Sequence, residues 1–394
     1  MKINWKSSKK LSLPLNIVIF NLCKMWPFRN HKIWIFGASK GNKYEDNSRY
    51  MFEYVCNHPE NEIHAVWLCN EQSVMDRVNA DGHDACLNSS IRGKWFQLRA
   101  GVALYTHGLN DFGTFPLVGG ACCVALWHGL GFKRIYNGKY YGLNLKVKRI
   151  LDHFFSWTYR DITPVTSQYA CEWSRKMFTL NESGLKITGY PRNDAFKYVK
   201  RDKILELLHI DKTKKIIIYM PTYRQQSLGE NAMNDIVKEL YYCEELGVFL
   251  RENNYIFLVK PHPLTPHIEL MKRVDFIVID HQAVEDNQQL MAVADILVTD
   301  YSSCFVDYAL LNRPIVFYTP DDEIFLKKSE QMEPEYFEIS ALCKASSPQE
   351  LISCLRKPNM KLVERTNTIF EDDNICGTCY SENVYNEICK EIGL

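Results

Sequence analysis

The feature that most constrains the fold of this 394-residue chain is a series of short, continuously apolar segments separated by stretches long enough for helices. Such segments are typical of strands in a parallel sheet, where crossover helices bury both faces. They fall in two series. We expect strands at residues 32–36, 63–68, 102–106 and 121–127, and then at 216–220, 255–259, 276–279, 296–299 and 314–318.

The two series predict two domains, since the chain suits two domains of about 150 to 200 residues better than one. A turn-rich segment, Gly189–Asp194, and a charged helix expected at 201–208 separate them. We therefore predict an α/β protein with two doubly wound, Rossmann-like domains facing a central cleft, at residues 31–195 and 210–394. Ligands of such sheets bind beyond the carboxyl ends of the strands.

Residues 1–30 form a separate segment that is basic and apolar. It carries six Lys or Arg residues and no acidic residue, and Trp5 and Trp26 flank an apolar run at 11–23. A membrane-spanning helix needs about 20 apolar residues, so this run is too short. The pattern is typical of a segment that lies on an anionic membrane surface, and a first helix packed on the body of the protein is the alternative.

Composition excludes several classes of function. Lys plus Arg equals Asp plus Glu, at 47 each, so net charge predicts no affinity for nucleic acid. Neither a P-loop nor a Gly-x-Gly-x-x-Gly after a strand is present, which disfavours ordinary ATPase and dinucleotide redox chemistry. Acidic pairs such as Asp321–Asp322 are not at the end of a strongly apolar strand, so we expect no metal and no other cofactor.

Polar residues follow several predicted strands, beginning with Trp127, His128 and Gly129 after the run at 121–126. Gly129 permits a tight turn. A neutral imidazole at this point can act as a general base near pH 7, and a capping or core histidine is the alternative. Lys133 follows closely and can attract an anionic substrate.

Two further strand ends carry cations and a second histidine. Arg224 follows the strand at 216–220, and Lys260 and His262 follow the strand at 255–259. Prolines on both sides of His262 stiffen its loop. Arg224 offers a planar fork that suits phosphate oxygens, and Lys260 offers a point charge.

A helix start and the interdomain turn supply the remaining candidates. Serines at a helix start can donate to a pyrophosphate beside the free N–H groups, and a plain serine N-cap fits equally well. Asp307 can reach a ligand hydroxyl, while Arg192 and Asp194 can pair across the hinge or contact the ligand. The residues that open the helix are Thr299, Asp300, Ser302 and Ser303.

In this order, these segments resemble the CDP-glycerol glycerophosphotransferase family, which builds teichoic acids and related envelope polymers. The resemblance spans residues 46–307. The matching segments are Asp46–Ser48, Trp127–Gly129 with Lys133, Gly189–Asp194, Pro221–Arg224, Lys260–Pro263, and Thr299–Ser303 with Asp307.

The resemblance implies a GT-B fold and a transferase that moves glycerol phosphate from CDP-glycerol to a hydroxyl of a lipid-linked or polymeric envelope acceptor, releasing CMP. It implies a peripheral position on the cytoplasmic face of the bacterial membrane. It also implies that His128 deprotonates the acceptor. The groups it assigns to the donor pyrophosphate are His262, Arg224, Ser302 and Ser303, within a CDP-binding second domain.

Two departures from the family pattern leave the donor open. The segment after Pro320 lacks the usual Arg-Gly-aromatic stretch and Pro-Gly turn, and Leu130 replaces a small polar residue. CDP-ribitol or another CDP-alditol is therefore an alternative donor. A GT-B sugar transferase or nucleotide-sugar epimerase using a UDP-sugar is a second alternative, and a membrane-surface protein that binds nucleotide without turnover is a third.

Overall fold

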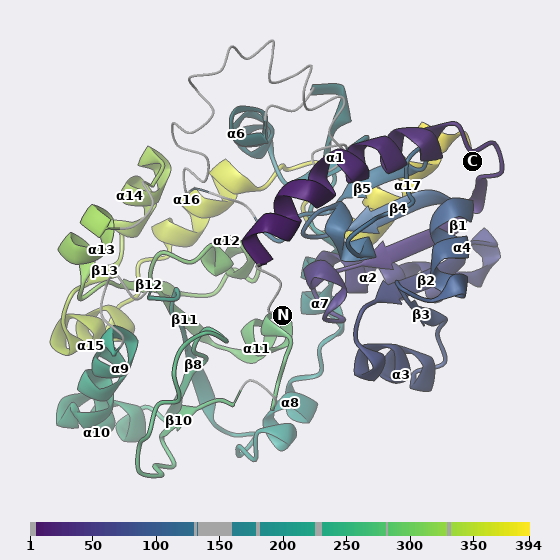
Figure 1. Ribbon diagram of the computed structural model, residues 1–394. Coiled ribbons are helices and arrows are strands. Elements are labelled where there is room, and N and C mark those ends of the chain that lie inside the picture. Colours follow the sequence, from purple (N-terminus) through teal and green to yellow (C-terminus); the bar gives the residue numbers. More distant parts are fainter. Residues whose placement is uncertain are drawn as a thin grey trace. The chain divides into compact units, whose positions relative to one another are not determined.

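The structure is a computed structural model that describes residues 5–129, 132, 160–178, 182–224, 231–280, 283–328 and 332–394. The chain divides into two compact units. Unit 1 comprises Met1–His128, Tyr136–Asp194 and Asp373–Leu394, and unit 2 comprises Gly129–Ile135 and Ala195–Asp372. Each is built on a wholly parallel sheet with helices around it (Figure 1).

The main sheet of unit 1 has five strands in the order β3-β2-β1-β4-β5. The chain starts in the middle, winds to one edge and then returns to the other, which is the doubly wound arrangement. An isolated bridge between Val124 and Ile162 leads to a two-stranded sheet of β6 and β7. The strands are β1 (Asn30–Gly37), β2 (His64–Cys69), β3 (Ala85–Leu87), β4 (Ala100–Tyr105), β5 (Cys122–Ala125), β6 (Thr163–Val165) and β7 (Leu185–Ile187).

Alternate strand residues of unit 1 contribute to two separate hydrophobic cores, as the two-residue period of a strand requires. Trp34 and Trp67 belong to the core that α2 (Asp46–Cys56), α3 (Gln72–Ala80) and α17 (Tyr380–Ile392) complete. Ile35 and Leu68 belong to the core that α1 (Trp5–Lys24), α4 (Ile91–Arg99) and η3 (Leu109–Phe112) complete. The remaining helices of this unit are α6 (Gln168–Phe178), η1 (Ser39–Gly41), η2 (Pro59–Asn61), η4 (Glu182–Gly184) and η5 (Pro191–Asp194).

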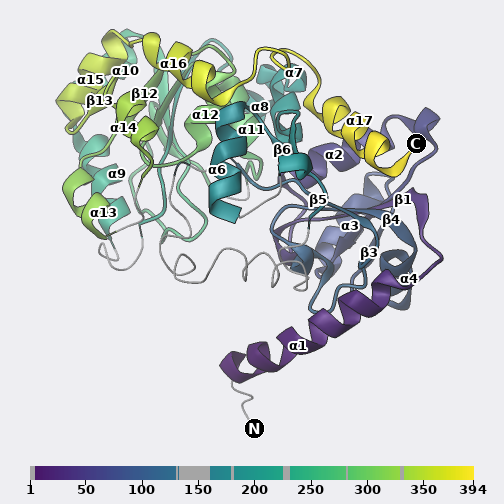
Figure 2. The same ribbon diagram turned by 90° about the horizontal axis from the view of Figure 1, so that it is seen from above.

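Helix α1 packs on unit 1 through the end of its apolar run. Phe20 belongs to the second core, and Cys23, one turn later, is also buried. A Cβ on Gly119 would lie 1.9 Å from the Phe20 carbonyl oxygen, so only glycine allows the helix to come this close. The first turns of α1 project beyond the unit (Figure 2). Within the described ranges, no helix has the length and apolarity needed to cross a membrane.

Unit 2 contains a six-stranded sheet in the order β10-β9-β8-β11-β12-β13. Helices α10 and α15 pack together and contact β9, β12 and β13, whereas α11 and α12 contact β8 and β11. The strands are β8 (Lys215–Met220), β9 (Tyr255–Val259), β10 (Phe276–Val278), β11 (Ile296–Thr299), β12 (Ile315–Tyr318) and β13 (Lys344–Ala345). The helices are α7 (Ala195–Tyr198), α8 (Arg201–Leu207), α9 (Ala232–Tyr242), α10 (Glu244–Glu252), α11 (Asn287–Val293), α12 (Cys304–Ala309), α13 (Asp322–Lys328), α14 (Pro334–Ser340), α15 (Pro348–Arg356) and α16 (Lys361–Phe370).

The α/β class and all nine predicted strands are confirmed, and the short strands β3, β6, β7 and β13 are additional. The chain division differs from the predicted 31–195 and 210–394. Residues 129–135 belong to unit 2 and residues 373–394 return to unit 1, because Val384 and Ile388 of α17 fill the core beside α2. The arrangement of two domains around a central cleft stays a prediction.

Candidate active site

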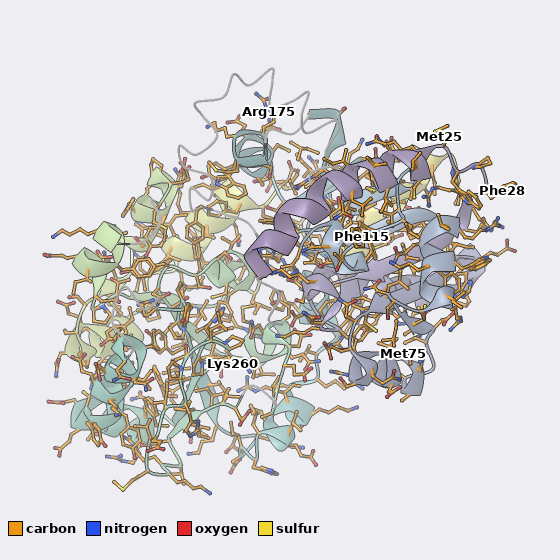
Figure 3. All side chains as sticks on the ribbon, viewed as in Figure 1. Met25, Phe28, Met75, Phe115, Arg175 and Lys260 are labelled. Carbon is orange, nitrogen blue, oxygen red and sulfur yellow. The ribbon has the colours of Figure 1, made fainter. Side chains whose placement is uncertain are left out.

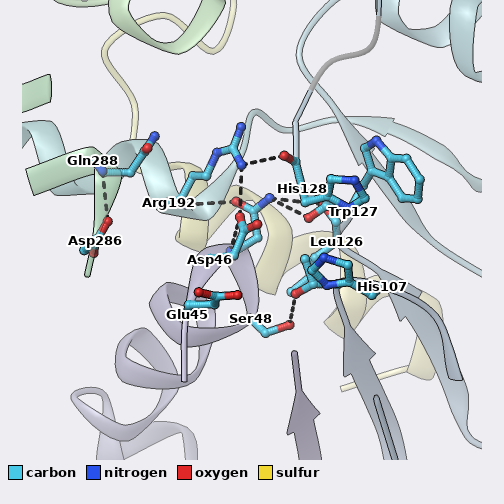
Figure 4. Close-up of polar contacts among 12 residues, drawn as sticks. Glu45, Asp46, Ser48, His107, Leu126, Trp127, His128, Arg192, Asp286 and Gln288 are labelled. Atoms are coloured by element: carbon cyan, nitrogen blue, oxygen red, sulfur yellow. Dashed lines mark hydrogen bonds and ion pairs between the residues drawn. The ribbon is translucent and has the colours of Figure 1, made fainter. Parts of the chain in front are cut away.

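Two histidines meet at the carboxyl edge of the unit 1 sheet. His107 follows β4 and His128 follows β5, and these neighbouring parallel strands end side by side. The two imidazole rings stack with centroids 4.6 Å apart and planes 7° apart (Figure 4). The Trp127 ring lies 4.1 Å from the His128 ring. Both histidines are exposed, so the pair is open to a substrate.

The backbone around this pair is strained. Ser39 (φ +48°), Lys40 (φ +59°), Asp46 (φ +63°) and Trp127 (φ +57°) all have left-handed conformations without being glycine. Such residues cost of order 1–3 kcal/mol each and cluster at functional sites, where surrounding contacts hold them. Gly129, which follows His128, is buried. Its φ of +136° is a backbone conformation that favours glycine over residues with a side chain.

The start of α2 holds the two strand ends in place. The Asn47 amide donates to the carbonyl oxygens of Leu126 (3.2 Å) and Trp127 (2.9 Å). The Ser48 hydroxyl lies 2.7 Å from the Thr106 hydroxyl. Asn47 and Ser48 are both fully buried, so these bonds fix the backbone on which both histidines stand (Figure 4).

Arg192 reaches the same place from η5. Its guanidinium Nη1 donates to the Asp46 carboxylate (3.0 Å) and to the His128 carbonyl oxygen (2.8 Å). Its backbone N–H donates to the Asn47 side chain at 3.0 Å. The structure therefore places Arg192 beside Trp127 and His128 through contacts to protein groups, and its contact with a ligand stays a prediction.

Asp194 is engaged by backbone groups. Its carboxylate accepts the backbone N–H groups of Tyr380 (2.9 Å) and Ser381 (2.8 Å), at the first turn of α17. Asp194 is buried, and these bonds satisfy donors that the helix leaves unpaired. In the structure Asp194 anchors the last helix, and its pairing across a hinge or contact with a ligand stays a prediction.

The surroundings keep the His128 imidazole neutral. Desolvation, followed by repulsion from His107, lowers the pKa of His128 to about 4; Arg192 lowers it further, and Asp46 opposes the shift. The ring is therefore unprotonated at pH 7 and can accept a proton.

His107 is the member of this site that the sequence argument missed. The available signal was its position directly after the predicted strand at 102–106, the same criterion that identified His128. Its Nδ1 accepts the Ser39 backbone N–H at 3.2 Å, which places the proton of the neutral ring on Nε2.

In unit 2, the predicted donor residues lie at one edge of the sheet, because β9, β8 and β11 are adjacent and parallel. The residues in this set divide into buried and accessible groups. Arg224, Lys260, Thr299, Asp300 and Asp307 are buried, whereas His262 is exposed and Ser302 and Ser303 are half-buried. Lys133 lies outside the described residues.

Arg224 is engaged by carboxylates. Its Nε and Nη2 contact Asp321 (2.7 and 3.0 Å), and its Nη1 lies 2.8 Å from Asp300. The side chain is 1% exposed. Burial alone would lower the pKa of Arg224, but Asp300 and Asp321 raise it above its ordinary value. In the structure the fork closes on Asp321, and its contact with phosphate stays a prediction.

Asp321 is also a residue that the sequence argument set aside. It lies three positions after β12, at the same edge of the sheet as Arg224, and its carboxylate pairs with that arginine. The expectation that this pair is not at the end of a strongly apolar strand is corrected to a position just beyond the end of β12. The neighbouring Asp322 accepts the Tyr301 hydroxyl at 2.9 Å.

Thr299 and Asp300 tie neighbouring strands together. The Thr299 hydroxyl donates to the Met220 carbonyl at 2.9 Å, which joins β11 to β8. Asp300 accepts the Thr222 N–H at 2.8 Å as well as pairing with Arg224. Both side chains are buried in these bonds, and their direct contact with a donor stays a prediction.

The residues nearest to solvent at this edge are His262 and the two serines. His262 Nδ1 accepts the Leu264 N–H at 3.2 Å, and the Tyr223 ring lies 5.3 Å from the imidazole. Ser302 Oγ accepts the N–H of Cys304, the first residue of α12, at 3.4 Å. By contrast, the Lys260 ammonium donates to the Val284 carbonyl at 2.7 Å inside the unit.

Comparison with known sequences identifies the family to which the chain belongs. A profile described as CDP-glycerol:poly(glycerophosphate) glycerophosphotransferase matches residues 18–370. The teichoic acid poly(glycerol phosphate) polymerase of Bacillus spizizenii is 26% identical over 97% of this chain and 93% of its own length. The teichoic acid glycerol-phosphate primase of Bacillus subtilis is 30% identical over 52% of each chain. The teichoic acid poly(ribitol-phosphate) polymerase of Bacillus spizizenii is 23% identical over 93% of this chain and 57% of its own.

Solved structures support the fold. The wall teichoic acid polymerase TagF matches with a TM-score of 0.76 and 21% identity, over 96% of this chain and 93% of that one. The Staphylococcus aureus MnaA–UDP structure matches with a TM-score of 0.56 and 14% identity, over 92% and 97% of the two chains. At these identities the structural matches show a common two-domain α/β fold. Evidence on the reaction comes from the sequence relatives.

Proposed function

Because the chain belongs to the CDP-glycerol:poly(glycerophosphate) glycerophosphotransferase family, we propose that it transfers glycerol phosphate from CDP-glycerol to a hydroxyl of a lipid-linked or polymeric cell-envelope acceptor. Family membership makes the chain a phosphotransferase that uses a CDP-alditol in teichoic acid synthesis. The choice of glycerol follows the relatives named for poly(glycerol phosphate).

The observation that carries the mechanism is the neutral, exposed His128 imidazole at the end of β5. In the proposed reaction this ring accepts the proton of the acceptor hydroxyl while the hydroxyl oxygen attacks the phosphorus that bears glycerol. The bond from that phosphorus to the bridging oxygen of CMP breaks, and CMP leaves with the electron pair. Positioning and charge stabilisation supply most of the catalysis in such transfers.

The donor pyrophosphate is assigned to the accessible residues of unit 2. We propose that His262, Ser302 and Ser303 contact it, because their side chains reach solvent at the carboxyl edge of the sheet. The buried set beneath them holds the loops in shape. That set is Arg224, Lys260, Thr299, Asp300 and Asp307.

Helix α1 and the turn after it are the proposed contact with the inner face of the cell membrane. The face opposite Phe20 exposes Leu15, Val18 and Leu22, and the following turn exposes Met25 and Phe28 (Figure 3). Exposed apolar side chains on a basic segment suit the interface of an anionic bilayer.

The membrane contact is tested by replacing the exposed face alone. The triple variant Leu15→Ser, Val18→Ser, Leu22→Ser should sediment less with vesicles that contain anionic lipid. Ile91→Ser is the matched control, because Ile91 is exposed in the same unit at 92%. Sedimentation equal to wild type in the triple variant would leave α1 as a packed helix only.

The donor is tested by CMP release from CDP-glycerol, CDP-ribitol and a panel of UDP-sugars, with membrane extract as the source of acceptor. Release from CDP-glycerol alone supports the proposal. Release from CDP-ribitol alone would assign the chain to the reaction named for the ribitol-phosphate relatives. UDP release from a sugar donor, with no CMP from either alditol, would refute the proposed reaction.

The base is tested by His128→Ala, which should abolish turnover while the protein stays folded. His64→Ala is the control, because His64 is an exposed histidine at the opposite end of the same sheet, where β2 begins. More than a tenth of the wild-type rate in His128→Ala would remove His128 from the role of base.

A further inference from the structure

We propose that His107 is a positioning residue for the transfer reaction, which holds the His128 imidazole in place and keeps it unprotonated. This inference rests on the proposed function, in which His128 accepts the acceptor proton. It assigns a role to a residue that lies outside every matching segment named for the family resemblance. Three observations support the inference: the stacking of the two rings, the hydrogen bonds that anchor His107, and the charged groups around the pair.

His107 is held firmly enough to orient a neighbour. Its backbone N–H donates to the Asp111 carboxylate at 2.8 Å, and the same carboxylate accepts the Thr106 N–H (2.9 Å) and the Lys40 N–H (2.6 Å). Asp111 is fully buried, so this turn cannot shift without leaving an unpaired carboxylate. The ring is fixed separately through the Ser39 N–H.

The ring of His107 is placed against the face of His128 and not in its plane. A centroid separation of 4.6 Å with planes 7° apart is a stack, in which the nitrogens of one ring do not donate to the other. His107 therefore does not occupy the His128 nitrogens, and the His128 side chain hydrogen-bonds to the Thr106 backbone. Its effect on His128 is exclusion of water from one face and fixing of the ring plane.

The stack also disfavours the charged form of His128. Desolvation, the larger cause, and repulsion from His107 both lower the pKa of His128. The other charged groups that face His128 are Arg192, which adds repulsion, and Asp46, which opposes it. Asp111 faces His107 from η3. His107 is the ring that both covers His128 and adds to this repulsion.

The experiment compares the pH dependence of kcat/KM for CMP release in wild type, His107→Ala and His107→Phe. The alanine removes both the covering ring and its repulsion of the charged His128 ring, so the acid limb should move up toward the ordinary histidine value of about 6.5. At that value only about a quarter of His128 is neutral at pH 6, so kcat/KM at pH 6 should fall about four-fold relative to pH 8. The wild-type ratio should stay near one.

His107→Phe is the conservative variant. It retains a stacked ring and removes the charge, so it should keep most of the wild-type rate at pH 8 and show a smaller shift than the alanine. His64→Asn is the control for loss of an exposed histidine in this unit and should leave the acid limb unchanged. Thermal unfolding of each variant confirms that it is folded.

A second measurement is independent of turnover. Histidine Cε1–H signals are titrated by NMR, and the His128 signal is identified by its loss in His128→Asn. An upward move of its midpoint in His107→Ala supports the inference. An unmoved midpoint, or a rate loss that is equal at every pH, would overturn it. Absence of wild-type turnover with every CDP-alditol would refute the proposed function instead, and the NMR midpoint would still decide the role of His107.

Discussion

Replacement of Arg224 gives the sharpest test of how unit 2 is held together. The side chain is 1% exposed, its partner Asp300 is fully buried, and Asp321 is 17% exposed. Arg224→Ala leaves Asp300 charged, buried and without its cation. Removing one partner of a buried ion pair costs about 3–5 kcal/mol. For a unit of this size, that loss lowers the unfolding temperature by on the order of 10 °C.

The assay is urea and thermal unfolding of the full chain, with hydrogen exchange of the β8 and β11 peptides to identify the transition of unit 2. Arg365→Ala is the matched control, because Arg365 pairs with Glu338 on the surface, where the two side chains are 43% and 53% exposed. An exposed pair contributes less than about 1 kcal/mol. Asp321→Asn should fall between the two, since it keeps a hydrogen-bond acceptor and loses the charge.

A loss in Arg224→Ala no larger than that of Arg365→Ala would refute the structural role. If such a variant also bound CDP-glycerol more weakly, the original sequence interpretation of Arg224 as a phosphate ligand would be supported. If stability falls as expected, Arg224→Lys should recover only part of it, because an ammonium cannot pair with two carboxylates in the planar geometry of a guanidinium.

Three further predictions concern unit 1. Asp194→Ala should destabilise α17 by about 1–2 kcal/mol, measured as faster proteolysis of the C-terminal segment. Gly189→Ala should be more destabilising in thermal unfolding than Gly377→Ala: both glycines have φ near +77°, but a Cβ on Gly189 would lie 2.0 Å from the Tyr380 ring, whereas Gly377 faces open space. The lowered pKa of His128 means that the unfolded chain binds more protons between about pH 6.5 and 4, so the stability of unit 1 should fall as pH falls through that window, and less steeply in His128→Phe.

Local pattern was enough to predict most of the fold. A strand that is buried on both faces must be apolar throughout, so segments such as 216–220 and 296–299 were recognisable without any partner strand. Strand ends were recognisable for the same reason, because the apolar run stops there. That is why His128, His262 and Ser302 were found from the sequence.

The same reasoning could not identify partners that lie across the fold. Arg224 was given to phosphate because nothing in its segment reveals Asp321, which is 97 residues away in the chain and beside it in space. Asp194 was placed at a hinge because its partner, the first turn of α17, comes 186 residues later. Helix α17 itself could not be assigned to unit 1, because amphipathic sequence shows that a helix has a buried face and does not show which core receives it.

The sequence by itself determined the α/β class, both series of strands and the polar residues that follow the strand ends. The order of the motifs that contain these residues determined the family. Those properties depend on burial periodicity and short motifs, which are local. Only the tertiary structure decided that Arg224 closes on carboxylates, that Asp194 anchors α17 and that His107 stacks on His128. Each of these pairings joins segments distant in the chain, and their free energy depends on distance and desolvation, which exist only once the chain has folded.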